Sequence, residues 1–548
     1  MKKEMKMNFK NIFSAVAAAA MLTACVGDLN TIPLNPTDVT SETAYGDDEA
    51  GYVQGLAKIY FQLTSNNTQD LQVADGGASE FIRAFWSTQE VTADAAKCAW
   101  GDAWVNDLNQ NTWKGDVLND AVYAVYVRTL QGITYVNEYL RQTSDANLSS
   151  RGCSDAVKAK VQEFRAEARF LRAYFYWAAM DTFGQVPFST EETQFGGGYN
   201  PPQQPREFIF DFVVSELEAL AADDSAMPAA QSNYPRADKG SVLGLLARVY
   251  LNAEVYTGVA KWEEAKATCE KIYNLGYALA PTHAELFRGD NGENEKAVKE
   301  MLFAASYDAE NNQSYGGTTY LTLSTLSGDD GAVQITGING GWAGNRVPYE
   351  YVQSFFTDVK NPDYTEGTYE FADKRAGYFF IKGRSESLKN KLNVFLNGWS
   401  CIKFNNIPHN KTAEEYAETA ATKNFSDIDW PLIRLGEIHL IYAEACMHAG
   451  GSAAMQLAAL AERAGVEAPA EVTEAWLMAE RARELMWEGH RRTDLIRYGL
   501  WLTDEYVWPY KGGSVNGQKL PSYFNIFPIP STELATNLDL QQNPGYAR

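Results

Sequence analysis

Apolar residues recur at steps of three and four along most of the chain, which is the spacing that places them on one face of an α-helix. The clearest example is 157–181, where Phe164 and Leu171 share a face. Gly184 and Pro187 then end the pattern, as expected just beyond a helix. The same periodicity predicts further helices at about 120–141, 206–222, 239–256, 261–275, 434–449, 453–465 and 474–499.

Several predicted helices come in pairs joined by a short polar turn. In the clearest pair, a helix ending at Tyr256 is followed, after Thr257-Gly258, by one running from Trp262 to Gly276. This pair resembles a tetratricopeptide hairpin, a unit that buries its apolar face by stacking on its neighbours. We therefore predict a mostly α-helical protein built on a scaffold of tetratricopeptide-like helical hairpins.

The composition changes between about 281 and 430, where Gly, Asn, Thr and aromatic residues gather. Segments such as 315–320 (YGGTTY) and 339–342 (NGGW) are typical of loops and short strands. Binding residues are often carried on such loops above a rigid scaffold. The helical pattern resumes at Trp430, so we expect one body over 41–548, with a helical scaffold at about 41–280 and 430–548 and an irregular ligand-binding half at about 281–430.

The first 24 residues have the pattern of a secretory signal peptide, with lysines before an apolar run that is too short to span a bilayer. The run ends in Leu22-Thr23-Ala24-Cys25, which resembles a bacterial lipoprotein cleavage site. We expect Cys25 to be lipidated and residues 25–40 to form a tether, which anchors the protein to the membrane. No other run of about 18 apolar residues follows.

Charge and cysteine content reduce the number of functional classes that fit the chain. The chain has 548 residues with Asp+Glu 70 against Lys+Arg 47, a net charge of -23, so nucleic acid is a poor partner. The cysteines beyond Cys25 form no CxxC pair, and we interpret them as buried small apolar residues. They are Cys98, Cys153, Cys269, Cys401 and Cys446.

Known catalytic motifs are absent from the sequence. There is no HExxH, no Gly-rich phosphate loop and no GxSxG, and only five histidines occur. Paired carboxylates for glycoside hydrolysis remain an alternative, because sequence does not give their separation. Asp290, Glu293 and Glu295 are candidate calcium ligands, although a solvated loop is the favoured interpretation. We expect no required cofactor, with structural calcium as the one candidate.

Tryptophan is concentrated in one part of the chain. Four of the 13 tryptophans fall within residues 86–113, beside several aspartates. Sugar rings stack their C–H faces on aromatic rings, and their hydroxyls need carboxylate or guanidinium partners. Although each Trp taken singly is more often a core residue, the cluster favours carbohydrate binding. Its members are Trp86, Trp100, Trp104 and Trp113.

Several ordered motifs resemble the SusD/RagB family. They begin with Glu167–Ala173 and continue to the C-terminus, so that together with the signal peptide they cover the whole chain. The motifs are EARFLRA at 167–173, FGQVPF at 183–188, PLIRLGE at 431–437, ER at 480–481, EGHR at 488–491, IFPIP at 526–530 and QNPGY at 542–546.

The resemblance is closest to the starch-binding founder of that family. It implies an α-glucan site in which Trp100, Tyr315 and Trp342 form a curved aromatic platform, while Asp75 and Arg83 bind sugar hydroxyls. Ala103 stands where the founder has an asparagine, so that polar contact is either lost or supplied by Asp102.

The resemblance also implies a role in transport. Family members are cell-surface lipoproteins of the outer membrane that capture glycan and pass it to a SusC-type TonB-dependent porin, without cleaving any bond. We therefore expect a starch-binding protein that is not an enzyme. The alternatives are a binding protein for another glycan, a structural lid of the porin whose sugar binding is dispensable, and a glycoside hydrolase.

Overall fold

The computed structural model describes residues 41–66, 71, 73, 75–193, 200–389 and 391–548. The predicted signal peptide, Cys25 and the tether lie outside these residues. Within them, no helix combines the length and the apolar character that crossing a membrane would take.

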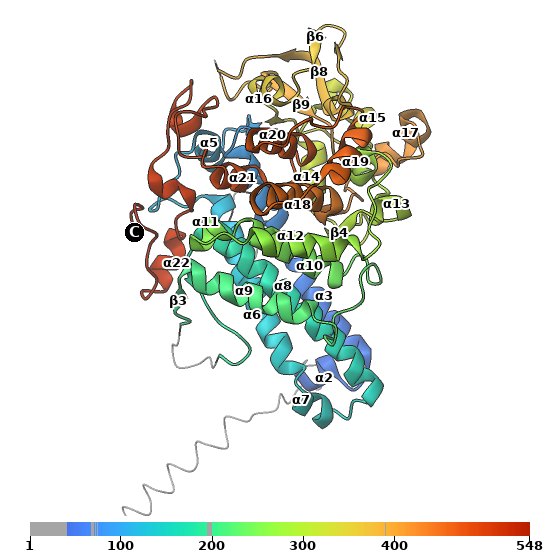
Figure 1. The fold of residues 1–548 in the computed structure, drawn as a ribbon, viewed down its shortest axis with the longest axis vertical. Helices are drawn as coiled ribbons and strands as arrows, with labels where there is room; N and C mark the ends of the chain where they lie inside the picture. The colour runs from blue at the N-terminus through green and yellow to red at the C-terminus, as the bar shows by residue number, and fades with distance from the viewer. Residues whose placement is uncertain (1–40, 67–70, 72, 74, 194–199, 390) are drawn as a thin grey trace, which may run out of the picture.

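Most of the described chain before residue 280 is helical, as predicted. The long helices pack in an ordered stack, in which α6 contacts α8, α8 contacts α9, α9 contacts α10 and α10 contacts α12 (Figure 1). The helices of this half are α2 (Ser41–Tyr45), α3 (Glu49–Thr64), α4 (Phe81–Trp86), α5 (Ala103–Gln110), α6 (Asp120–Gln142), α7 (Asp145–Ser150), α8 (Asp155–Phe183), α9 (Arg206–Ala221), α10 (Lys239–Leu251), α11 (Ala253–Thr257) and α12 (Trp262–Tyr273).

Helix α8 occupies the centre of this stack. Its N-cap, Ser154, accepts a hydrogen bond from the main-chain N–H of Val157, and the helix ends before Gly184. Every residue from Phe170 to Phe183 is buried. A helix that is buried on all sides needs neighbours around its whole circumference, which α3, α6 and α9 help to provide.

The stack continues after residue 430, where α18 packs on α12 and α20 packs on α18. The pairing of α10 with α12 confirms the predicted hairpin. The later helices are α18 (Leu435–Ala449), α19 (Ala454–Ala464), α20 (Glu474–Glu484), α21 (Arg491–Arg497) and α22 (Ser531–Thr536).

The single helix predicted at 474–499 is wrong, because the structure has two helices, α20 and α21, with a break between them. Trp487 in the break has a left-handed backbone (φ 65). Its indole Nε1 donates to the carbonyl of Ala95 at 2.9 Å, while Glu488 turns inward to Lys403 and Arg434. These long-range contacts override the local helical periodicity.

The segment 281–430 is irregular, as predicted, and forms much of the end of the molecule opposite to α2 and α7 (Figure 1). Its helices are α13 (Glu295–Val298), α14 (Gly317–Leu323), α15 (Ala332–Thr336), α16 (Tyr349–Phe355) and α17 (Ala413–Thr422). Strands in the described chain are short and form antiparallel pairs. The pairs are β1 (Lys97–Cys98) with β5 (Asn345–Arg346), β2 (Val186–Pro187) with β3 (Gln203–Gln204), β4 (Met301–Ala305) with β10 (Trp430–Arg434), β6 (Lys360–Asp363) with β7 (Thr368–Glu370), and β8 (Phe379–Ser385) with β9 (Gly398–Cys401).

A buried network of charges joins the irregular segment to the C-terminal helices. Arg434 is 1% exposed and lies 3.0 Å from Glu300, 2.7 Å from Glu484 and 2.6 Å from Glu488. Lys403 adds a second ion pair to Glu488 at 2.6 Å. Buried charges are tolerated only when paired in this way, so the network commits the two segments to one arrangement.

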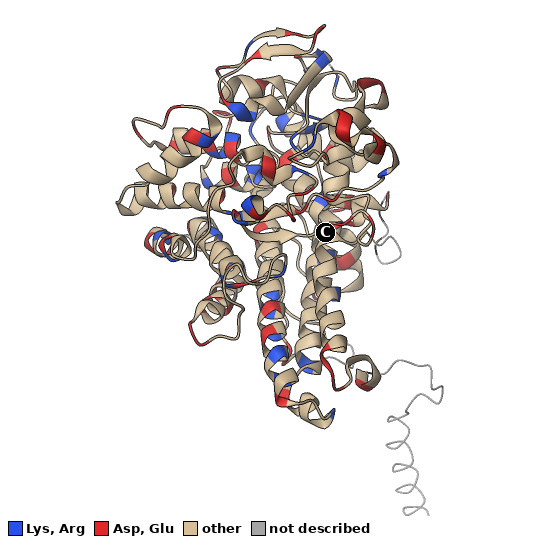
Figure 2. Cartoon of the chain, turned by 90° about the vertical axis from the view of Figure 1, so that its right-hand side faces the viewer, with Lys and Arg blue, Asp and Glu red and all other residues tan. Residues whose placement is uncertain are grey.

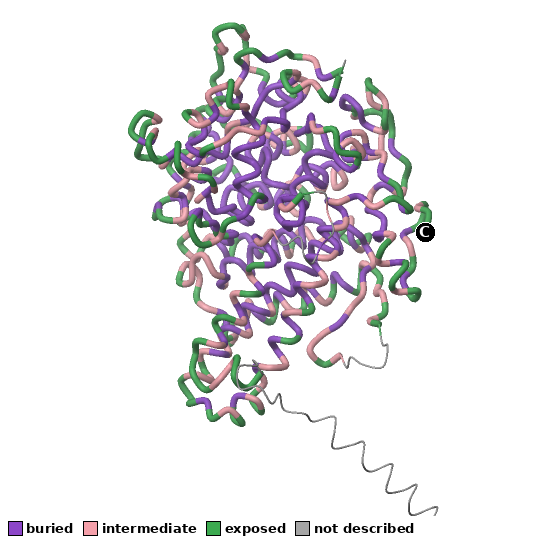
Figure 3. The backbone as a smooth tube through the Cα atoms, turned by 180° about the vertical axis from the view of Figure 1, so that it is seen from behind, coloured by how far each residue is buried: buried purple, intermediate pink, exposed green. Residues whose placement is uncertain are grey.

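One apolar core cluster includes residues from Tyr52 to Leu540 and so draws on both the scaffold and the irregular segment. Figure 3 shows the buried backbone running through the middle of the body, with exposed backbone at its ends. Figure 2 shows acidic and basic residues mixed along the chain. Cys98, Cys153, Cys269, Cys401 and Cys446 are buried free thiols, which confirms the interpretation made from the sequence.

Candidate functional site

Asp75, which precedes helix α4, and Arg83, which lies within it, form an ion pair with two hydrogen bonds. Arg83 Nη1 donates to Asp75 Oδ1 at 2.7 Å and Nη2 donates to Oδ2 at 3.1 Å. The Asp75 side chain is 48% exposed, whereas that of Arg83 is 3% exposed. The carboxylate is therefore the member of the pair that faces solvent, and the guanidinium holds it in orientation.

Arg83 also contacts the first of the three predicted platform rings. Its guanidinium lies 5.4 Å from the ring centre of Trp100 and 4.3 Å from that of Tyr320. Tyr320 is buried on α14 and meets Trp100 edge to face, with ring centres 5.8 Å apart. Its hydroxyl donates to Asn345 Oδ1 at 3.2 Å. Tyr320 thus supports both Arg83 and Trp100 from below the surface.

Main-chain pairing sets the position of Trp100 relative to Trp342. Strand β1 pairs with β5 through Cys98 and Asn345, and the N–H of Ala99 donates to the carbonyl of Gly344 at 2.8 Å. Trp100 Nε1 donates to the carbonyl of Ala343, the residue after Trp342, at 3.1 Å. Gly344 has φ +119, and a Cβ atom there would lie 2.4 Å from Trp100 Nε1, so this approach requires glycine.

Tyr315 and Trp342 lie side by side, with ring centres 6.3 Å apart and planes tilted by 46°. Tyr315 is 52% exposed, and Trp342 is partly buried. Phe425 continues the aromatic surface, since its ring centre lies 5.0 Å from that of Tyr315. The result is a tilted, partly exposed aromatic surface made from three distant parts of the chain.

Close packing at Gly77 joins the ion pair to the aromatic surface. A Cβ atom at Gly77 would lie 2.5 Å from Arg83 Nη1 and 2.5 Å from the carbonyl oxygen of Tyr315. Only glycine lets the Tyr315 backbone come this close to Arg83. The structure therefore brings together Asp75, Arg83, Trp100, Tyr315 and Trp342, which the sequence places in separate segments.

Asp102 lies at the edge of this site, two residues after Trp100. It is exposed and precedes α5, and its side chain does not cap that helix by a hydrogen bond. Its carboxylate is therefore available to solvent next to the platform.

A buried acid anchors the loop that carries Tyr315. Glu80 accepts hydrogen bonds from the hydroxyls of Ser314 and Tyr307. Burial raises the pKa of Glu80 to about 8, and the Arg83 and Arg128 charges and these hydrogen bonds oppose the rise. Glu80 thus sits behind the site and positions its loop.

The other tryptophans of the predicted cluster belong to the core. Trp86 is 0% exposed, Trp113 2% and Trp104 8%, so none of them offers a ring face to a ligand. The expectation that the cluster as a whole serves carbohydrate binding was therefore wrong for these three. These tryptophans are buried because later segments pack against them. For example, the ring centres of Trp86 and Trp487 lie 5.2 Å apart.

The structure does not support the candidate calcium site at Asp290, Glu293 and Glu295. Asp290 is engaged by His409, whose N–H donates to Oδ1 at 2.9 Å and whose Nδ1 lies 2.6 Å from Oδ2. Glu295 begins helix α13. Across the described ranges, no group of three or more His, Cys, Asp or Glu side chains is arranged to hold a metal ion.

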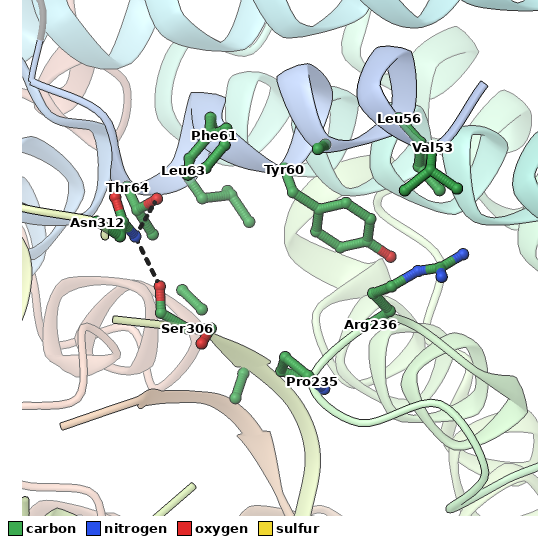
Figure 4. A pocket seen from close by; sticks show the side chains of 13 residues that line it. Val53, Leu56, Tyr60, Phe61, Leu63, Thr64, Pro235, Arg236, Ser306 and Asn312 are labelled. Atoms are coloured by element: carbon green, nitrogen blue, oxygen red, sulfur yellow. Dashed lines mark hydrogen bonds between the residues drawn. The ribbon is translucent and has the colours of Figure 1, made fainter. Parts of the chain in front are cut away.

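An apolar pocket of about 190 Å³ lies elsewhere, against helix α3 (Figure 4). Figure 4 shows Tyr60 reaching across it toward Arg236. Three of its polar side chains are already bonded, since Asn312 Nδ2 donates to Thr64 Oγ1 at 3.1 Å and Tyr60 donates to Glu167 at 2.7 Å. Most of its lining is apolar, which suits sugar hydroxyls poorly.

Sequence reasoning missed the supporting residues of the site, namely Tyr320, Phe425, Glu80 and the glycines at 77 and 344. Tyr320 is the last residue of the YGGTTY segment, and the sequence alone does not distinguish it from any other aromatic residue of a loop. The two glycines were the one available signal, because glycine beside predicted binding residues often marks a close approach of the backbone.

Comparison with known proteins gives a consistent result along the chain. Residues 299–546 match the model of the SusD family, and residues 72–251 match a family described as starch-binding associating with outer membrane. The chain is 31% identical over 576 aligned positions to the starch-binding protein SusD of Bacteroides thetaiotaomicron, covering 98% of this chain and 99% of that protein. It is 22% identical to a SusD-like protein of Bacteroides ovatus, covering 92% and 85%.

Solved structures share the fold at lower identity. A SusD superfamily protein from Parabacteroides distasonis superposes with a TM-score of 0.68 at 19% identity, covering 93% of this chain and 100% of that one. Surface glycan-binding protein A from Bacteroides thetaiotaomicron, in complex with laminarihexaose, gives a TM-score of 0.66 at 18% identity, covering 90% and 99%. Given the near full-length match to a relative above 30% identity, the chain belongs to the SusD family.

Proposed function

We propose that this protein is a cell-surface lipoprotein of the outer membrane that captures starch or related α-glucan oligosaccharides. The proposal rests on one geometric observation above all. The rings of Trp100, Tyr315 and Trp342 and the Asp75 carboxylate, which come from distant segments, meet at one partly exposed place. The name of the 31% identical relative, a starch-binding protein, supports the choice of starch.

In the proposed mode of binding, the three rings stack on the C–H faces of successive glucose units. The tilt of 46° between Tyr315 and Trp342 suits a chain that curves, as α-linked glucan does. Each stacking contact contributes about 1 kcal/mol beyond its area burial, so affinity for a short oligosaccharide is modest and rises along a polymer that offers repeated units.

The polar groups give orientation. Asp75 accepts hydrogen bonds from sugar hydroxyls, and Arg83 holds its carboxylate in place through two hydrogen bonds. Asp102 supplies a further acceptor at the platform edge. No catalytic residue is assigned, because the related proteins are named for binding and the site acts by shape and hydrogen bonding alone.

We further propose that lipid on Cys25 holds the protein at the membrane and that the captured glycan passes to a SusC-type TonB-dependent porin. The cleavage-site sequence that ends in Cys25 supports the anchor, and the description of the matched family supports the outer membrane. Replacing Cys25 by serine should move the protein from the membrane fraction to the soluble fraction, whereas wild-type behaviour of Cys25→Ser would refute lipidation.

Affinity electrophoresis against amylose, laminarin and inulin tests the ligand. We expect retention by amylose, and a loss of roughly tenfold in affinity for each of Trp100→Ala and Trp342→Ala. Trp262→Ala is the matched control. Trp262 is also partly buried, but it lies on the helical scaffold and stacks on His448, with ring centres 4.2 Å apart. Retention by laminarin instead of amylose would assign a different glycan.

Growth on starch separates capture from a purely structural role at the porin. If the protein acts only as a lid, Trp100→Ala and Trp342→Ala will leave growth unchanged even though they weaken retention on amylose. Release of reducing sugar from starch by the purified protein would instead support a hydrolase.

A further inference from the structure

A second cavity, of about 350 Å³, has a different character from the aromatic platform. None of its lining residues belongs to the platform, and none of the described residues that line it is an Asp or a Glu. This is unexpected in a chain with 70 acidic and 47 basic residues. Its basic lining consists of Arg288, Lys374, Arg375, Lys403 and Arg463.

Three of these five cations are already neutralised by buried carboxylates. Arg375 pairs with Asp373, Glu480 and Glu484, and Lys403 pairs with Glu488. Arg463 Nη1 lies 2.5 Å from Glu300, and its Nη2 lies 2.5 Å from Glu484. However, Arg463 Nε is buried without a hydrogen-bond partner, and the residue is 8% exposed. One donor of this lining arginine therefore remains unsatisfied.

The other two cations have no carboxylate partner within the described chain. Arg288 forms no side-chain hydrogen bond or ion pair there, and burial lowers the pKa of its guanidinium, with Tyr378 and Asp290 as the opposing influences. Asp290 is itself engaged by His409. Lys374 is exposed and likewise unpaired. A partly desolvated guanidinium without a counter-charge is unfavourable, and an anion entering the cavity would relieve that cost.

His283 does not add a third free cation. Its Nε2 lies 2.9 Å from the carbonyl oxygen of Glu484, which can only accept, so Nε2 carries the proton. Nδ1 then accepts from the Tyr378 hydroxyl at 2.8 Å. Burial lowers the pKa of His283 well below its usual value, so the ring is neutral. The side chains that remain for a ligand are those of Arg288 and Lys374, because Arg463 Nε is buried and not accessible to solvent.

We propose that this cavity is a binding site for a small oxyanion, a carboxylate, phosphate or sulfate group, in which Arg288 makes a two-point contact and Lys374 supplies a second charge. The volume exceeds what a bare ion requires, so the cavity also accommodates an oxyanion carried on a sugar-sized group. The site is separate from the proposed glucan platform, and it would take a charged ligand where the platform takes a neutral one.

Inorganic sulfate and phosphate are the probes for the first experiment. Thermal unfolding of the whole protein is followed in sulfate and in chloride of equal ionic strength, and affinity is measured by calorimetry. Because sulfate stabilises most proteins non-specifically, we expect it to raise the Tm of the wild type above the chloride value by more than it does for Lys374→Gln. Arg288→Gln should weaken binding by about tenfold or more, and Lys374→Gln by about threefold to fivefold.

Lys382→Gln is the matched control, because Lys382 is an exposed lysine on the neighbouring strand β8 that does not line the cavity. Since Lys374 is exposed, Lys374→Gln will fold even if Arg288→Gln does not. Equal effects of sulfate and chloride on the wild type, or wild-type sulfate affinity in Lys374→Gln, would overturn the proposal.

Glucose 6-phosphate, compared with glucose and with free phosphate, distinguishes the two sources of the anion. Tighter binding of glucose 6-phosphate than of phosphate would support a site for a sugar-borne anion, and equal binding would support a site for the free ion. Binding of glucose as tight as that of glucose 6-phosphate would contradict an oxyanion site.

Discussion

The hydroxyl of Ser314 donates a hydrogen bond to the buried carboxyl group of Glu80. Ser314 immediately precedes Tyr315, and its Oγ also accepts from the N–H of Gly316 at 3.0 Å. Tyr307 donates to the other oxygen of Glu80. An exposed ring of the proposed glucan site is thereby held from behind by an acid that no ligand would touch.

The raised pKa of Glu80 should make the free energy of unfolding depend on pH. The folded-state pKa of Glu80 is raised from its ordinary value of 4.5 to about 8. Between these values the folded protein keeps a proton that the unfolded chain has lost, so the contribution of Glu80 to stability falls as pH rises, by up to about 1.4 kcal/mol per pH unit. Glu80→Gln stays neutral at every pH, so its free energy of unfolding should lack this pH-dependent contribution.

Urea unfolding at pH 5, 7 and 9 provides the measurement. The difference in unfolding free energy between Glu80→Gln and the wild type should shift in favour of the variant from pH 5 to pH 9. A constant difference across this range would show that Glu80 is ionised in the folded protein throughout.

A methyl group at Gly77 should disturb both halves of the glucan site. Its Cβ would lie 2.5 Å from both Arg83 Nη1 and the Tyr315 carbonyl oxygen, so one of them must move. We expect Gly77→Ala to weaken binding to amylose by roughly tenfold, because the Asp75 carboxylate or the Tyr315 ring leaves its position.

The matched control for Gly77→Ala is Gly328→Ala. A Cβ at Gly328 would meet no atom within 4 Å, and its backbone is open to any residue. Equal affinity of Gly77→Ala and Gly328→Ala for amylose would mean that the close approach at Gly77 is unimportant for binding.

Tyr320 should act on binding through its ring rather than its hydroxyl. Tyr320→Phe keeps the ring beneath Arg83 and Trp100 and loses only the bond to Asn345, so affinity should stay within about twofold of the wild type. Tyr320→Leu removes the support for both residues and should weaken binding by about tenfold. Calorimetry well below the Tm of each variant separates this effect from lost stability, and equal affinities of the two variants would argue against a positioning role.

Arg434 should dominate the stability of the link between the irregular segment and the C-terminal helices. Arg434→Met would leave Glu300, Glu484 and Glu488 buried with less compensating charge, and should lower the free energy of unfolding by about 3–5 kcal/mol. Urea unfolding measures this. The control is Lys160→Ala, which breaks a pair with both side chains about 40% exposed and should cost less than about 1 kcal/mol. Similar losses in the two variants would refute the importance of the network.

Local periodicity was sufficient to place the long helices. The pattern through Phe164 and Leu171 predicted α8 within two residues at each end, because a regular apolar stripe and a terminal glycine act locally. The break at Trp487 was not predictable in this way. Its cause lies in contacts with Ala95 and Arg434, which are far away in the sequence.

The same contrast holds for the site. Asp75, Arg83, Trp100, Tyr315 and Trp342 were found through family resemblance, whereas composition alone favoured a tryptophan cluster of which only Trp100 is accessible. Composition alone does not distinguish Trp100 from Trp104, since their exposure depends on packing by segments distant in the sequence, such as the one around Gly344 that contacts Trp100. Likewise, the unpaired Arg288 became recognisable only when its neighbours were known.

The pairing of β1 with β5 has a consequence for how ligand preference can change. Because main-chain bonds join the stretch before Trp100 to the stretch after Trp342, the gap between these two residues does not depend on which side chains they carry. A substitution at either position alters the size or polarity of one contact, and at Trp100 it also removes the Nε1 bond to Ala343, but the main-chain pairing that sets the spacing remains. Substitutions at these two positions can therefore change which saccharide binds, while the main-chain distance between the two stretches stays the same.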